Sequence, residues 1–119
     1  MPAERIATID FETTGVSPSR GDRATEVAIV MTENGRVVDR FQSLMHTGVP
    51  IPAFITELTG ITNAMVAAAP PAAQVMVEAA RFVGDTPLVA HNAGFDRRFW
   101  QDELARAGIN LDVRIEEFG

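Results

Sequence analysis

Two short acidic segments, each directly after an apolar strand pattern, constrain this chain more than any other feature of its sequence. The first, at residues 10–15, reads DFETTG, and the second, at residues 91–96, reads HNAGFD. A carboxylate at the edge of an apolar run is costly unless a cation or hydrogen bonds stabilise its charge. The acids therefore predict a metal site built from two distant parts of the chain.

The first segment follows residues 6–9, whose β-branched composition predicts a buried strand that runs into Asp10. Side chains two positions apart on a strand face the same way, so Asp10 and Glu12 point together. The pair could hold one hard cation or flank two ions about 3.5 to 4 Å apart, as in two-metal phosphoryl-transfer sites. Two solvated acids at a strand end are the alternative. The glycine-ended turn at residues 13–15 favours the metal site, because it lets backbone amides approach a ligand.

The second segment follows another short apolar strand, predicted at residues 87–90. Asp96 then lies at the start of a predicted helix with an apolar face that includes Phe95. An acid in a first helical turn has an ordinary explanation, since it complements the helix dipole. Considered together with the two acids of the first segment, Asp96 is predicted as the third metal ligand.

Three motifs in this order, DFETTG, LTGIT at residues 58–62 and HNAGFD, resemble those of the DEDD 3′–5′ exonucleases of the DEDDh type. The chain is similar to the epsilon proofreading subunit of bacterial DNA polymerase III and its relatives from about Ile6 to Gly108. The resemblance implies an α/β, ribonuclease H-like fold, in which helices flank a mixed β-sheet, and a single exonuclease domain over residues 1–119. It also implies hydrolysis at DNA 3′ ends, with RNA as the alternative substrate.

The resemblance also assigns roles to individual residues. Asp10, Glu12 and Asp96 match catalytic ligands of two divalent ions, Mg²⁺ or Mn²⁺, which suit hard oxygen donors. Leu58 matches a residue that wedges against the terminal base, although a core leucine in a short helix is the alternative. The other residues predicted to bind the 3′-terminal nucleotide are Thr13, Thr14, Gly15, Thr59, His91, Asn92 and Phe95.

The chain departs from the family pattern near its end. Complete members carry a third motif, in which a histidine general base precedes a final aspartate by five positions. His46 has Ile51 at that spacing, and His91 with Asp96 fits the second motif, so His91 is interpreted as a strand-end hydrogen-bonding residue. We therefore expect an N-terminal fragment, truncated at its C-terminal end and lacking the general base. The side chains expected to be partly uncovered are Phe99, Trp100 and Leu104.

Charge and composition narrow the function classes. The net charge of −6 argues against a broad basic surface for duplex DNA, although Arg97 and Arg98 beside Asp96 could contact a phosphate. The absence of cysteine suits a reducing compartment. No apolar run approaches the about 20 residues of a membrane span, so we expect a cytoplasmic protein with no membrane contact.

Local patterns predict the remaining elements. Strands at residues 24–32 and 36–45 are joined by an Asn-Gly hairpin turn. A short helix follows Pro50-Ile51-Pro52, and a longer one begins at Pro70-Pro71 and ends before Gly84.

Two functions follow from these patterns. The first is a metal-dependent, proofreading-type 3′–5′ exonuclease with single-stranded DNA ends and a DNA polymerase subunit as partners. The second is a catalytically inactive module that binds a 3′ end or a polymerase. Continuation of the reading frame into a His-x-x-x-x-Asp segment would favour the enzyme.

Overall fold

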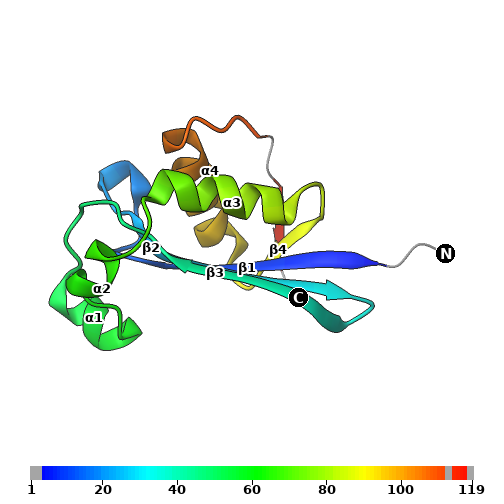
Figure 1. Ribbon diagram of the computed structural model, residues 1–119, viewed down its shortest axis with the longest axis horizontal. Helices are drawn as coiled ribbons and strands as arrows, with labels where there is room; N and C mark the ends of the chain where they lie inside the picture. The colour runs from blue at the N-terminus through cyan, green and yellow to red at the C-terminus, as the bar shows by residue number, and fades with distance from the viewer. Residues whose placement is uncertain (1–3, 112–113, 118–119) are drawn as a thin grey trace.

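A computed structural model describes residues 4–111 and 114–117 of the chain (Figure 1). In this part, five strands form one mixed sheet in the order β3-β2-β1-β4-β5. Strand β1 (Arg5–Thr13) pairs antiparallel with β2 (Ala24–Glu33), which pairs antiparallel with β3 (Arg36–Leu44). On its other side β1 runs parallel to β4 (Leu88–Ala90), which runs parallel to β5 (Ile115–Glu117).

Helical segments lie in the connections between these strands, except for the tight turn between β2 and β3. A 3₁₀ turn, Pro18–Arg20, lies between β1 and β2. Helices α1 (Ala53–Thr59), α2 (Asn63–Ala67) and α3 (Ala72–Val83) lie between β3 and β4, and α4 (Ala93–Arg106) joins β4 to β5. Figure 1 shows α3 and α4 over one face of the sheet, whereas α1 and α2 lie at the end away from the N-terminus. The predicted α/β arrangement, a mixed sheet flanked by helices, is confirmed.

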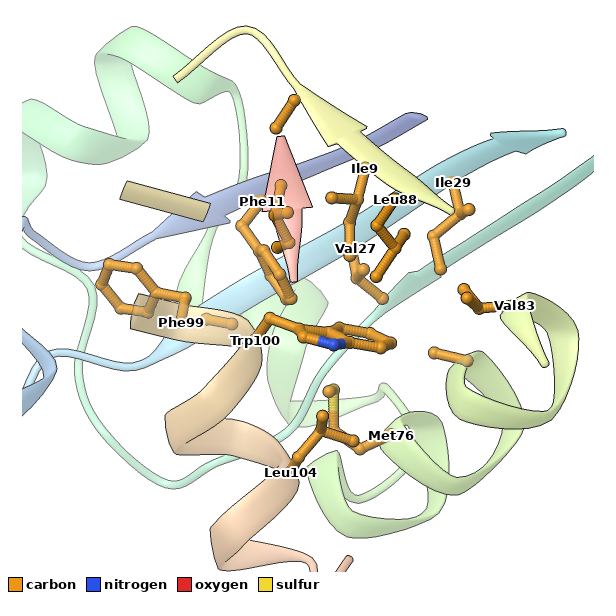
Figure 2. Close-up of a cluster of buried hydrophobic side chains, with 14 of the residues drawn as sticks. Ile9, Phe11, Val27, Ile29, Met76, Val83, Leu88, Phe99, Trp100 and Leu104 are labelled. Carbon is orange, nitrogen blue, oxygen red and sulfur yellow. The ribbon is translucent and has the colours of Figure 1, made fainter. Parts of the chain in front are cut away.

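The main core lies between the sheet and the pair α3 and α4. Trp100 of α4 is at its centre, with its ring centroid 6.3 Å from that of Phe11 on β1. Figure 2 shows the indole between strand residues on one side and Met76 and Leu104 on the other. The prediction that Phe99, Trp100 and Leu104 are partly uncovered is wrong, because the sheet and α3 bury all three.

Local turn chemistry explains where the elements end. Asn34 and Gly35 join β2 to β3 with positive φ angles of 52° and 82°, which is the geometry that two-residue hairpin turns require. Pro71 precedes the first residue of α3, and Gly84 follows its last. The hairpin and the longer helix are therefore confirmed at the predicted places.

The LTGIT motif contains a feature that the sequence analysis did not predict. It lies across two short helices rather than one, because Gly60 ends α1 with a φ of 78° and Thr62 starts α2. The hydroxyl of Thr62 accepts the N–H of Met65 at 3.1 Å, which caps α2. None of the described helices is long and apolar enough to cross a membrane.

Candidate active site

The position of Asp96 follows from the way β4 ends. The last residue of β1 that pairs with β4 is Thr8, opposite Val89, so the N–H of Phe11 lies beyond the end of the paired region. After β4 the chain turns into α4, whose N-cap Asn92 accepts a hydrogen bond from the backbone at 3.5 Å. The first turn of α4 brings Asp96 to β1, where its Oδ1 accepts the Phe11 N–H at 3.0 Å. Asp96 is only 3% exposed there.

The three predicted ligands lie close enough to interact electrostatically. Burial, as the largest cause, and the charges of Asp10 and Glu12 raise the pKa of Asp96 to about 6. Its backbone hydrogen bond and attraction to His91 oppose this increase. The pKa of Glu12 is also raised, first by burial and then by the charges of Asp10 and Glu26. Ionised together, these carboxylates repel one another.

The donor chemistry of this cluster fits a divalent cation. Asp10, Glu12 and Asp96 offer only carboxylate oxygens, which Mg²⁺ and Mn²⁺ prefer. Their mutual repulsion is the kind of energy that a bound cation offsets. Nevertheless, within residues 4–111 and 114–117 no three His, Cys, Asp or Glu side chains are grouped as one metal ion requires. The three carboxylates therefore have suitable donor chemistry, but among the described residues they do not meet at a single point.

A fourth acid, Glu26, adjoins the site, since its charge contributes to the raised pKa of Glu12. Antiparallel pairing of β1 with β2 puts it directly opposite Glu12. Its carboxylate accepts a hydrogen bond from Gln42 Nε2 on β3 at 3.0 Å. Like charges opposite each other on paired strands are destabilising. The opposition of Glu12 and Glu26 could not be predicted from the sequence. The loop between them and the bulge after Glu12 decide the strand register, and neither has a clear sequence signal.

A groove of about 200 Å³ lies beside Glu12, between the end of β1 and helix α1. Leu58 of α1 lines it and is 81% exposed, which excludes the core-leucine alternative. Four other predicted nucleotide-binding residues share this groove, namely Thr13, Gly15, Thr59 and Phe95. Val16 and Ile55 line it as well, and no sequence signal had distinguished them.

Other predicted residues make structural contacts. The buried hydroxyl of Thr14 donates to Asp22 Oδ1 and accepts the Arg23 N–H, both at 3.1 Å. Gly15 is needed for close approach, because a Cβ at this position would lie 2.5 to 2.6 Å from the carboxylate of Asp22. Asn92 caps α4, and neither it nor Thr14 lines the groove. These contacts shape the loop after the DFETTG motif.

A buried ion pair connects this loop to α4. Arg23 donates from Nε and Nη2 to the two carboxylate oxygens of Glu103, at 2.9 and 2.8 Å. The same carboxylate accepts the N–H of Ala24 at 3.1 Å, and Glu103 is 1% exposed. No sequence motif predicted this pair, although an acid on the apolar face of the last helix was a signal of it. The ion pair fixes α4, and with it Asp96, against the strands.

The mixed sheet carries acids on its central strand and a groove beside them, which is the arrangement expected of the ribonuclease H-like fold. The chain belongs to the exonuclease family, since it matches the RNase T exonuclease family model over residues 7–114. The predicted family is confirmed.

Two relatives show the similarity at the sequence level. The 3′–5′ exonuclease DinG of Bacillus subtilis is 41% identical over 111 residues, covering 93% of this chain and 12% of DinG. A DNA polymerase III subunit epsilon-like protein of Rhodobacter capsulatus is 44% identical over 105 residues, covering 87% of this chain and 15% of that protein. The chain therefore spans only 12% to 15% of the length of these relatives.

Solved structures show the same fold. Exonuclease I superposes with a TM-score of 0.81 at 19% identity, covering 90% of this chain and 25% of exonuclease I. The metal-free E. coli exonuclease I complex with single-stranded DNA superposes with a TM-score of 0.80 at 18% identity. This match covers 90% of this chain and 25% of that chain. The predicted ribonuclease H-like fold is confirmed.

Proposed function

We propose that this chain is a proofreading-type exonuclease domain that removes nucleotides from the 3′ ends of single-stranded DNA with the help of Mg²⁺ or Mn²⁺. The observation that carries the proposal is the hydrogen bond from Phe11 to Asp96, which fixes a carboxylate from α4 beside Asp10 and Glu12. Exonucleases of this family generally use divalent metal ions. In this proposal residues 1–119 belong to one exonuclease domain.

Each part of the site has a distinct task in the reaction. Asp10, Glu12 and Asp96 would hold two metal ions, which would supply positive charge for the reacting phosphate and for the attacking water. The Phe11 N–H and His91 favour the ionised form of Asp96, the form that binds a cation. The apolar groove at Leu58 receives the terminal base next to these carboxylates.

The identity of the relatives supports DNA as the substrate. One relative is named as a DNA polymerase III epsilon-like protein, and exonuclease I has been solved with single-stranded DNA. A DNA polymerase subunit is accordingly the proposed protein partner, and RNA is the alternative substrate. The net charge of −6 fits a site that acts on single-stranded ends rather than a broad duplex-binding surface.

In this proposal neither histidine of the chain is the general base. His46 Nδ1 shares a hydrogen bond with the carbonyl of Val66 at 3.1 Å, beside α2. His91 lies just before α4 and interacts electrostatically with Asp96. General-base assistance is worth about 10² to 10⁴-fold, so we expect the 119-residue polypeptide to cleave slowly or not at all.

A catalytically inactive 3′-end-binding module is the second candidate. It is favoured by one observation, namely that three metal ligands do not converge within the described residues. Such a module would use the groove at Leu58 and would need no bound metal ion. The two functions therefore differ in their metal dependence.

The test compares a linear single-stranded oligonucleotide with its circularised form, in Mn²⁺ and in EDTA. We expect the 119-residue chain to bind the linear form more tightly in Mn²⁺, and Asp10→Ala to abolish this preference. Slow shortening of 5′-labelled DNA from its 3′ end would accompany binding. Equal binding of linear and circular DNA would refute both functions, and a metal-independent preference for linear DNA would favour the inactive module.

A further inference from the structure

We propose that Phe54 of α1 is a second nucleotide-binding residue, which stacks on the base next to the 3′-terminal one. None of the three sequence motifs contains Phe54. The inference rests on the proposed function, because it extends the same groove by one nucleotide. The supporting observation is that large apolar side chains at and near that groove are exposed.

The three most exposed large apolar side chains in the described part of the chain are Leu58, Val16 and Phe54, at 81%, 70% and 68%. Leu58 and Val16 line the groove beside Glu12. Phe54 lies one helical turn before Leu58 on the same short helix. Exposed apolar side chains that gather at one place, rather than singly, mark a binding surface.

The geometry of α1 places these side chains in order. With about 100° of rotation per residue, Leu58 lies between Ile55 and Phe54, about 60° from the first and 40° from the second. Ile55 lines the groove and packs on the small cluster of Ile51, Ile61 and Val66. Phe54 therefore continues the row away from the groove floor, with a Cβ about 5 to 6 Å from that of Leu58.

This order fits a strand of nucleic acid better than another occupant. If Leu58 wedges beside the terminal base, the neighbouring apolar surface on the outer side faces the next base. A flat aromatic ring suits that place, because bases stack on aromatic side chains with little dependence on sequence. Val16, from the loop after β1, lines the same groove, so apolar side chains reach it from both the β1 end and α1.

The test measures binding of 5′-fluorescein-labelled (dT)4 and of unlabelled thymidine 5′-monophosphate, in Ca²⁺ to suppress cleavage. We expect Phe54→Ala to weaken (dT)4 binding about tenfold, from the usual strength of base stacking, and to leave the mononucleotide unaffected. Phe54→Trp keeps an aromatic ring and should bind (dT)4 about as tightly as the wild type does. Leu58→Ala should weaken both ligands, and Met65→Ala, an exposed apolar residue on α2, should weaken neither.

The outcomes separate this inference from the function on which it rests. No binding of (dT)4 by the wild type would refute the proposed function. Loss of binding in Leu58→Ala together with wild-type binding in Phe54→Ala would refute only the role of Phe54. Equal weakening of both ligands by Phe54→Ala would place the residue at the terminal base and overturn the proposal. The proposal would also be overturned if sedimentation showed that the wild type is a dimer and Phe54→Ala a monomer, with (dT)4 binding unchanged.

Discussion

The carboxylate of Asp96 accepts the backbone N–H of Phe11 at 3.0 Å, although the two residues are 85 positions apart. It thereby satisfies a strand N–H that lies beyond the region paired with β4. Burial at this place, as the largest cause, and the charges of Asp10 and Glu12 raise the pKa of Asp96 to about 6, and the hydrogen bond from Phe11 opposes this increase. One side chain thus both accepts the hydrogen bond of a strand N–H and contributes a carboxylate to the candidate catalytic site.

The raised pKa makes stability depend on pH in a defined direction. Between the unperturbed value of 3.8 and about 6, folded Asp96 binds a proton that the unfolded chain does not, so the free energy of unfolding falls as pH rises. Asp96→Asn keeps an acceptor for Phe11 and carries no charge. In EDTA we expect it to gain about 2 to 3 kcal/mol over wild type between pH 4 and pH 7. Urea unfolding across this range is the measurement, and a pH-independent difference would contradict the assignment.

Metal binding should depend on the exposed acid of the site. Asp10→Ala removes one of the proposed ligands without disturbing the core, since the side chain of Asp10 is exposed. We expect calorimetric titration with Mn²⁺ to show binding by the wild type and a lost or strongly reduced heat in Asp10→Ala. Glu78→Ala, which removes an exposed acid from α3, serves as the matched control. Equal heats for all three proteins would rule out the proposed ligand.

The buried ion pair should contribute far more to stability than an exposed one. Glu103→Gln leaves the guanidinium of Arg23, whose side chain is 13% exposed, without its counter-charge. We expect a loss of about 3 kcal/mol or more in the free energy of unfolding. The exposed pair of Arg5 with Glu33 provides the comparison, and Glu33→Gln should cost less than about 1 kcal/mol. Similar losses measured by urea unfolding would show that Glu103 is not tightly paired.

The close approach of Gly15 to Asp22 predicts a non-additive pair of substitutions. Gly15→Ala should cost about 1 to 3 kcal/mol, because the new Cβ displaces a carboxylate that holds Thr14 and the Ser17 N–H. Asp22→Ala alone should cost about 1 to 2 kcal/mol through these lost hydrogen bonds. The double variant should be about as stable as Asp22→Ala, since the clash is gone. Thermal melts of the four proteins would show additive losses if the loop were arranged differently.

Local sequence signals determined the individual elements. The Asn34-Gly35 turn, the proline before α3 and the glycine after it predicted where chain segments begin and end. They succeeded because turn and cap preferences depend on a residue's own backbone angles and its immediate neighbours. The motif order also determined the exonuclease family and the ribonuclease H-like fold, which the comparisons confirm.

Tertiary structure alone decided which of these residues meet and which are exposed. The Arg23–Glu103 ion pair joins positions 80 apart, and the opposition of Glu12 to Glu26 depends on a strand register with a bulge beside it. Leu58 was compatible with both a core and a wedge until its exposure on α1 was known. Periodicity specifies which face of an element is apolar, whereas long-range packing specifies what covers that face. That is why the sequence by itself could point to the acids of the candidate site but could not predict the contacts that position them.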